Sequence, residues 1–166
     1  MKVPRAFTLI ETLVAISVLL LALTGPLTIA ANALNSAYYA RDQVIASYLA
    51  QEGLEYVRAK RDENRIASPQ QAWLAGGLSN CLNAQCTVDF ANFTAPAICS
   101  SVCSPLKIAE SGNIYNQASG ANSRFTRVLT LTSVSATEVR AVVTVSWDLH
   151  GTKRTVTITE NFFQWI

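Results

Sequence analysis

The feature that most constrains this chain is a long uncharged stretch close to its N-terminus. Two basic side chains are the only charges before Glu11, and from residue 12 to residue 40 the only ionisable side chains are two tyrosine phenols. The block of residues 12–31 is about 20 residues long, enough for a helix to span a bilayer. A cleaved secretory signal would have a shorter apolar core. We therefore predict a membrane-spanning helix, with the basic N-terminus in the cytoplasm and the chain exported from Asn32 onward.

Glu11 is the unusual residue of this helix, because its carboxylate lies one turn inside an otherwise apolar stretch. An unpartnered carboxylate at mid-membrane costs about 2.5–3.5 kcal/mol. Either Glu11 lies near the interface and reaches water, or a positive charge from elsewhere neutralises it. No Lys or Arg follows before Arg41, but a cut between Ala6 and Phe7 would create an α-amino group on Phe7.

The segment Ala6-Phe7-Thr8-Leu9-Ile10-Glu11-Thr12-Leu13-Val14-Ala15 resembles the processing site of type IV prepilins and of the pseudopilins of type II secretion. In that family a peptidase removes a short basic leader before a Phe and methylates the new amine. The resemblance implies cleavage between Ala6 and Phe7 and N-methylation of Phe7. It also implies that Glu11, at the fifth mature position, pairs with the amine of a neighbouring subunit during filament assembly. The family usually has Gly before the cut, where this chain has Ala6.

The resemblance also implies partners and a location. The implied partners are prepilin peptidase, other pilin or pseudopilin subunits, the inner-membrane assembly platform and membrane lipid. The implied location is the inner membrane, crossed once, and then a periplasmic or cell-surface filament. Residues 1–6 would be a cytoplasmic leader, residues 7–31 the transmembrane and filament-core helix, and residues 32–166 the exported head.

Length and charge agree with one exported domain. A chain of 166 residues fits a single modest core. Of its 13 basic side chains, removal of Lys2 and Arg5 leaves eleven, equal to the 11 acidic ones. No basic face is left over for nucleic acid, and no nucleic-acid partner is evident. We predict no cofactor and no metal site, with an ion held by carbonyl groups of the loop from Cys99 to Ser123 left as an alternative.

We predict one long helix from about Phe7 to about Arg65. Gly25 and Pro26 interrupt its apolar part, and because Pro26 removes a backbone hydrogen bond we expect a kink or local melting there. Residues 32–65 continue as an amphipathic spine for the head, with an apolar stripe formed by Leu34, Tyr38, Ile45, Leu49 and Tyr56.

Two segments of this spine, residues 49–55 and 61–64, also resemble minor pilins of the type IV pilus and their type II secretion counterparts. For residues 61–64 a solvated, self-paired helix end is the favoured interpretation over a binding site. After the spine, Ser68 as a cap and Pro69 at the first helical position predict a short helix. That helix would carry Trp73 and Leu74 to the spine and end at residues 76–77.

Residues 79–123 are predicted to be loop-rich, and they contain all four cysteines: Cys81, Cys86, Cys99 and Cys103. These spacings are a loose match to a four-thiolate zinc site. Export to an oxidising compartment favours disulfides instead. Three connectivities are possible, and two local bridges are favoured over the nested pairs Cys81–Cys103 and Cys86–Cys99.

The C-terminal region predicts strands at residues 124–134, 138–149 and 155–163, joined by turns into an antiparallel meander. One face of the first strand carries Phe125, Arg127, Leu129 and Leu131, and one face of the second carries Val139, Ala141, Val143, Val145 and Trp147. The second half of the long helix is the only amphipathic element able to cover this sheet. The predicted fold is α+β and pilin-like, with the spine helix packed on a short antiparallel sheet.

No arrangement in the sequence points to catalysis. His150 is the only histidine and lies in a predicted turn, and no nucleophile has a visible base and orienting partner. We therefore predict a protein that is not an enzyme. The favoured function is a structural minor pilin or pseudopilin of a type IV pilus or a type II secretion pseudopilus. The alternative is a membrane-anchored exported binding module outside any filament, in which Glu11 has no role.

Overall fold

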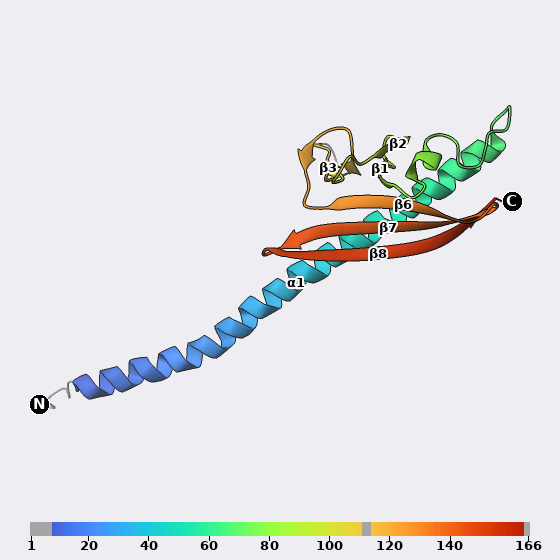
Figure 1. Cartoon of the computed structure of the whole chain (residues 1–166). Helices are drawn as coiled ribbons and strands as arrows, with labels where there is room; N and C mark the ends of the chain where they lie inside the picture. The colour runs from blue at the N-terminus through green and yellow to red at the C-terminus, as the bar shows by residue number, and fades with distance from the viewer. Residues whose placement is uncertain (1–7, 111–113, 165–166) are drawn as a thin grey trace, which may run out of the picture. The chain divides into compact units, whose positions relative to one another are not determined.

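The computed structural model describes residues 8–110 and 114–164 (Figure 1). Its first element is the long helix α1 (Leu9–Ile66), followed by a 3-10 helix, η1 (Leu78–Cys81). The described residues then form the strands β1 (Gln85–Asp89), β2 (Thr94–Ile98), β3 (Lys107–Ile108), β4 (Tyr115–Asn116), β5 (Ala121–Asn122), β6 (Thr126–Ser135), β7 (Glu138–Leu149) and β8 (Thr152–Phe163). The chain divides into two compact units, one up to Arg41 and one from Asp42 onward.

Helix α1 is continuous over 58 residues, which confirms the single long helix predicted from the sequence. It ends at Ile66, one residue beyond the predicted end. The predicted start at Phe7 lies outside the described residues. Alanine and leucine are frequent along the whole helix, and both favour helical backbone.

The larger sheet is antiparallel with the strand order β2-β1-β6-β7-β8. Strands β6, β7 and β8 form the predicted meander, and β7 pairs with β8 without interruption along both strands. The turn between β7 and β8 consists of His150 and Gly151, which have positive φ angles of 52° and 77°. Two successive residues with positive φ are what a tight two-residue hairpin turn requires.

The buried faces of β6 and β7 are the faces predicted from alternation. All nine side chains named for those faces are at most 2% exposed: Phe125, Arg127, Leu129, Leu131, Val139, Ala141, Val143, Val145 and Trp147. The residues between them on β7 point to the other side of the sheet and are exposed or half-buried. The core therefore lies on one face of the sheet.

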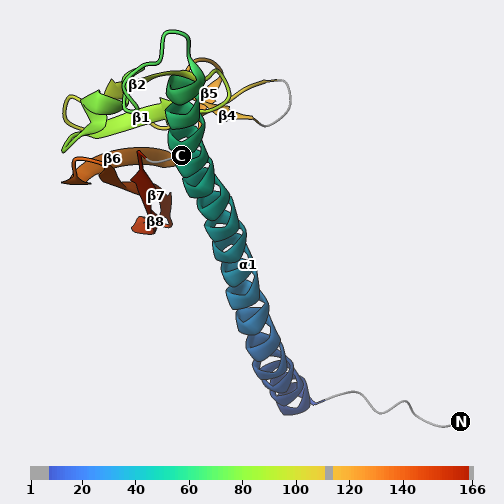
Figure 2. The same ribbon diagram turned by 90° about the vertical axis from the view of Figure 1, so that its right-hand side faces the viewer.

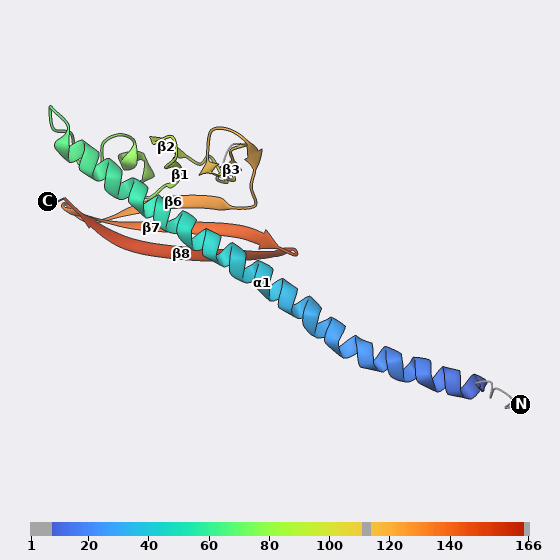
Figure 3. The same ribbon diagram turned by 180° about the vertical axis from the view of Figure 1, so that it is seen from behind.

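The second half of α1 covers this face, as predicted (Figures 2 and 3). Small residues make the approach close, because Ala46, Ala50 and Gly53 are buried where the helix meets the strands. A Cβ atom on Gly53 would lie 2.9 Å from Val143 Cγ1 and 3.3 Å from Arg127 Cδ. Glycine at position 53 therefore sets how closely α1 packs on β7.

Residues 79–123 contain more structure than the predicted loop. Strands β1 and β2 form a hairpin that extends the meander, and β1 pairs with β6 through Cys86 and Leu129. Three two-residue strands form a second sheet with the order β4-β3-β5. Tyr56 of α1 donates a hydrogen bond from its hydroxyl to the carbonyl oxygen of Thr94 at 2.6 Å, which ties β2 to the helix.

The short helix predicted from Ser68 is wrong: residues 67–69 form a bend, residues 70–72 are irregular and residues 73–77 form turns. The reason is that Asn64, buried near the end of α1, binds this segment. Its Nδ2 donates to the carbonyl oxygens of Trp73 at 3.2 Å and Ala75 at 3.0 Å. These bonds fold the chain back onto the helix end, and Trp73 packs against the core as expected.

Two disulfides join Cys81 to Cys86 and Cys99 to Cys103. This is the local pairing and not the nested one. With all four sulfur atoms in disulfides, the four-thiolate zinc interpretation does not apply. The first bridge ties η1 to β1, and the second closes a loop after β2.

Candidate functional site

Helix α1 begins with a cap that places Glu11 in its first turn. Ala6 and Phe7, the predicted cleavage and methylation positions, lie outside the described residues. The carbonyl oxygen of Thr8 accepts backbone N–H groups from Glu11 and Thr12 at 3.1 and 3.2 Å, and its hydroxyl is 3.4 Å from the N–H of Glu11. A carboxylate three residues after a threonine cap is favoured by the helix dipole. None of the cations in residues 8–110 and 114–164 pairs with Glu11.

The first part of α1 presents its apolar side chains outward. Leu9 is 82% exposed, Leu21 76% and Ile29 71%. By length and composition this helix could cross a membrane, and no residue of its apolar window is buried. Such a surface needs lipid or other protein around it, because large contiguous apolar patches are rare on soluble monomers.

Hydroxyl groups in this segment bond to the backbone of the helix itself. The donor and acceptor pairs are Thr12 Oγ1 to Leu9 O (2.8 Å), Ser17 Oγ to Leu13 O (2.8 Å), Thr24 Oγ1 to Leu21 O (3.0 Å) and Thr28 Oγ1 to Thr24 O (2.5 Å). These hydroxyls need no outside partner, so they are compatible with an apolar environment.

Helical structure continues through Gly25 and Pro26, so the structure has no melted segment there. Pro26 has no N–H to donate to the carbonyl of Ala22, which weakens the helix locally. A Cβ on Gly25 would meet no atom within 4 Å. A kink at these two residues stays a prediction.

The predicted apolar stripe is buried only in its second half. Leu49 and Tyr56 are buried and Ile45 is half-buried against the core. Leu34 and Tyr38 are 60% and 50% exposed. The stripe therefore belongs to two environments, and the change falls close to Asp42, where the second unit begins.

Buried charges hold the second half of α1 to the sheet. Arg127 of β6 is fully buried, and its Nη1 donates to Leu49 O at 3.1 Å and to Glu52 Oε1 at 3.0 Å. Its Nη2 donates to Val88 O at 2.8 Å. One guanidinium thus links α1, β6 and β1. The alternation of β6 indicated that Arg127 faces the core, but no sequence pattern indicated its partners.

A second ion pair lies where the head begins. Asp42 is 1% exposed, and its Oδ2 accepts a hydrogen bond from Arg124 Nη1 at 2.8 Å. The sequence pattern does not mark Asp42 as buried, because Asp42 follows Arg41 in a run of mixed polar residues.

Residues 61–63 at the end of α1 pair with close neighbours, as the favoured interpretation held, but the group is not fully solvated, because Asn64 is only 3% exposed. Lys60 Nζ donates to Glu63 Oε2 at 2.7 Å, and Arg61 Nε donates to Asp62 Oδ1 at 2.8 Å. Asn64 is buried in the turn contacts described above. This arrangement explains the cluster as local structure.

The β1–β2 hairpin carries a buried carboxylate with a lowered pKa. Burial of Asp89 works to raise its pKa, but hydrogen bonds from the Asn92 side chain and from the backbone N–H groups of Gln117 and Asn92 lower it below its usual value. Burial, with the nearby charges of Glu63 and Asp89, raises the pKa of Tyr56 to about 12. Both groups keep one protonation state near neutrality and act as structural anchors.

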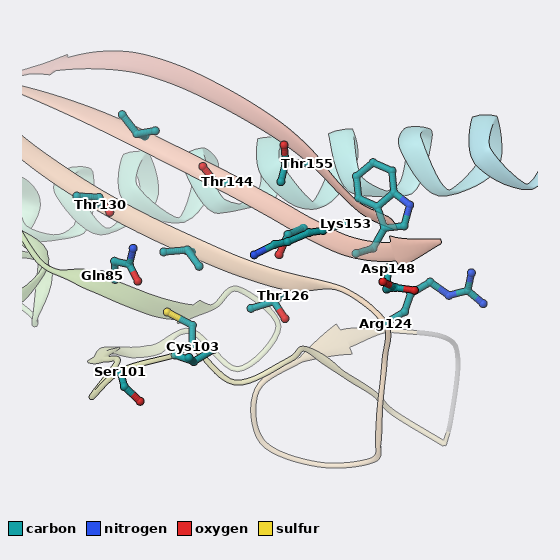
Figure 4. Close-up of a pocket in the computed structure, with 15 residues that line it drawn as sticks. Gln85, Ser101, Cys103, Arg124, Thr126, Thr130, Thr144, Asp148, Lys153 and Thr155 are labelled. Carbon is teal, nitrogen blue, oxygen red and sulfur yellow. The ribbon is translucent and has the colours of Figure 1, made fainter. Parts of the chain in front are cut away.

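A groove of about 580 Å³ lies on the face of the sheet that α1 does not cover (Figure 4). Its floor is formed by alternate residues of the meander: Thr126, Val128, Thr130, Val142, Thr144, Ser146 and Thr155. The Cys99–Cys103 loop lines another side through Ser101 and Val102, and Arg124 and Lys153 contribute cations. Asp148 also lines the groove, and Arg124 is already paired with Asp42, so the groove offers hydroxyl groups and charges of both signs.

His150 is exposed in the β7–β8 turn. Across the part of the chain that the structure describes, no three His, Cys, Asp or Glu residues are grouped so as to hold a metal ion.

Comparison with family models matches residues 1–25 to the prokaryotic N-terminal methylation motif. The match includes the capped helix start, Glu11 and the first half of the apolar segment, and it points to a structural, non-enzymatic protein. No curated protein and no solved structure matches the chain.

Proposed function

We propose that this chain, whose N-terminus is that of a type IV prepilin-type protein, is a minor pilin or pseudopilin that is built into a type IV pilus or a type II secretion pseudopilus. The observation that carries the proposal is the coincidence of the methylation motif with a helix whose apolar side chains are exposed in the single chain. A filament of bundled helices, or a membrane before assembly, supplies the apolar surroundings that this surface requires.

In this proposal the chain is made with a short basic leader and is held in the inner membrane by the first part of α1. Prepilin peptidase cuts between Ala6 and Phe7 and methylates the amine of Phe7. The head, from Asn32 onward, is exported, and the assembly platform then moves the subunit from the membrane into a filament on the periplasmic side or the cell surface.

Glu11 sets the axial position of each subunit. Its carboxylate pairs with the α-amino group of Phe7 on a neighbouring subunit as the apolar helices bundle. Within such a bundle an unpaired carboxylate costs several kcal/mol, so positions along the helix that leave Glu11 alone are disfavoured. The resemblance of residues 49–55 and 61–64 to minor pilins favours a minor subunit over a major one.

The first experiment reads the N-terminus. The full chain is expressed in cells with an active prepilin peptidase, extracted from membranes, and analysed by intact mass and N-terminal sequencing. We expect a chain that begins at methylated Phe7. A chain that retains Met1 would contradict the proposal, and a peptidase-deficient strain provides the control that retains the leader.

The second experiment separates the two roles open to Glu11. Both Glu11→Ala and Glu11→Gln remove the negative charge, but glutamine can still act in the helix cap. We expect both variants to insert in the membrane and both to be absent from sheared filaments, while Glu55→Ala on the same helix assembles. Assembly of Glu11→Gln at the normal level would mean that Glu11 is only a capping residue, and would contradict the pairing mechanism.

The second candidate function is a membrane-anchored binding module outside any filament. The groove on the outer sheet face, with its disulfide-closed side, favours this function. It predicts that Glu11→Ala leaves surface display of the head unchanged. The same experiment therefore decides between the two functions.

A further inference from the structure

We propose that the outer edge of strand β8 is a docking site where the head accepts an extended segment of a different polypeptide as one more strand of the sheet. The proposal goes beyond filament assembly, because it concerns a surface of the head and not the N-terminal helix. It rests on the backbone pattern of β8, on its contrast with the opposite edge, and on the charges along the strand.

Strand β8 is a long and regular edge. Among the described residues it pairs only with β7, and that pairing runs over Thr152–Phe163 without a bulge. The strand contains no proline. Alternate N–H and C=O groups on its outer side are therefore arranged to bond to a further strand.

The opposite edge of the same sheet is protected. Strand β2 covers only Thr94–Ile98, and Pro96 lies at its centre. Its pairing with β1 is shifted between Thr87 and Asp89. A short strand, a proline and an irregular register are three of the devices by which proteins prevent pairing at an edge, and charged side chains are another. Strand β8 has none of the first three. Its charged residues, Lys153, Arg154 and Glu160, restrict pairing to a strand of complementary charge.

The side chains of β8 define the pattern of the incoming strand. On the helix-covered face, Val156 and Ile158 are only half-buried and pack at the border of the core. On the other face Thr155, Thr157 and Thr159 are exposed. A strand with apolar residues at alternate positions would cover Val156 and Ile158 and place polar residues beside the threonines.

Charge defines one end of the incoming strand. Lys153 and Arg154 are exposed at the start of β8. The acid further along the strand, Glu160, is already engaged by Arg58 Nη2 at 2.6 Å. Asp148 of β7 lies opposite Lys153 in the β7–β8 pairing, so two cations and one acid leave the edge with a net positive charge near the turn. Acidic residues of an incoming strand would complement this charge.

A second copy of this chain fits the edge poorly. Parallel, in-register pairing of two β8 strands would place Lys153 and Arg154 beside the same cations of the other copy, which is destabilising. Antiparallel pairing over the full length of both strands would place Lys153 opposite Phe162 and Arg154 opposite Asn161, so neither cation would meet an acid.

The test uses the full chain in detergent and two synthetic peptides of about ten residues, a typical strand length. Both peptides alternate valine and threonine. One ends in two aspartates, which lie opposite Lys153 and Arg154 in antiparallel pairing, and the matched control ends in two lysines. We expect the aspartate peptide to bind about threefold or more tightly by fluorescence anisotropy. We also expect it to slow hydrogen exchange at alternate amides of β8 but not of β2.

Two variants complete the design. Lys153→Glu, at an exposed position, should reduce or reverse the preference between the peptides. Ile158→Lys places a charge on the helix-covered face of the edge strand and should abolish peptide binding. Thermal unfolding of this variant verifies that the head still folds. The proposal is overturned if binding leaves β8 exchange unchanged, if protection falls on residues 101–103 of the groove, or if β8 becomes protected with rising protein concentration in the absence of peptide. Peptide binding requires neither cleavage nor Glu11, so its failure is distinct from failure of the filament proposal.

Discussion

The two halves of α1 form one continuous helix but carry opposite kinds of surface. In the first half the large apolar side chains are exposed, and the segment holds a single carboxylate at Glu11. In the second half Leu49, Leu54 and Val57 are buried, and charges such as Glu52 bind partners on the sheet. The halves differ in what surrounds them and not in their secondary structure.

This difference shows where the helix obtains its stability. Isolated helices are marginal in water, and most helical stability in proteins comes from packing. The second half packs within its own chain, so mutations there should act on folding. The first half has no such partner among the residues that the structure describes, so mutations there should act on insertion and assembly. Each prediction below tests this division.

The largest effect on folding is expected from Arg127→Ala. The change removes a fully buried side chain and leaves the carbonyls of Leu49 and Val88 and the carboxylate of Glu52 without their donor. We expect the free energy of unfolding of the head to fall by about 3–5 kcal/mol. Denaturant unfolding measures this loss. Arg140→Ala, at an exposed position of β7, should change the free energy by less than about 0.5 kcal/mol.

A smaller effect is expected from adding one methyl group at each of two glycines of α1. At Gly53 the new Cβ would lie 2.9 Å from Val143 Cγ1. Overpacking of this kind costs about 1–3 kcal/mol, partly offset by the better helix propensity of alanine. Gly53→Ala should therefore lower the melting temperature of the head, whereas Gly25→Ala, with nothing within 4 Å, should not. Equal melting temperatures for the two variants would break the division between the halves.

The smallest effect is a pH dependence confined to the head. Because the pKa of Asp89 is lowered in the folded protein, its stabilising contribution is present above the unfolded pKa of about 3.9. That contribution is lost as the pH falls through the lower folded pKa. Urea unfolding at a series of pH values between about 5 and 3 should show decreasing stability. Asp89→Asn should flatten this dependence, and an unchanged slope would mean that other carboxylates carry it.

Regular periodicity accounts for the parts of the fold that the sequence predicted. The uncharged run and the amphipathic continuation predicted α1, and strict alternation predicted β6, β7 and their buried faces. Arg127 was placed on the core face by alternation alone. The Arg127 guanidinium contacts Val88 of β1, a strand that the sequence pattern did not predict. The role of Arg127 in linking three elements could therefore not be derived.

The missed elements have identifiable causes. Strand β1 is short, and Pro96 at the centre of β2 is a signal against a strand. After Ser68 the signals for a helix cap were present, but the Asn64 amide binds the carbonyls of that segment. In the first case the local pattern itself argues against a strand, and in the second a contact with Asn64, which lies outside the predicted helix, replaces the helix. The predicted roles of Ala6, Phe7 and Glu11 concern processing and neighbouring subunits, which a single chain does not contain.

The disulfide pattern has a consequence for how the head matures. Cys81 joins Cys86 and Cys99 joins Cys103, so the two cysteines of each bridge lie only five and four positions apart in the sequence. Neither bridge needs the C-terminal meander to be in place. If the head is exported as proposed, both bridges can form from near neighbours while the chain is still folding, without sorting between distant thiols. Correct oxidation therefore does not require distant parts of the chain to meet first.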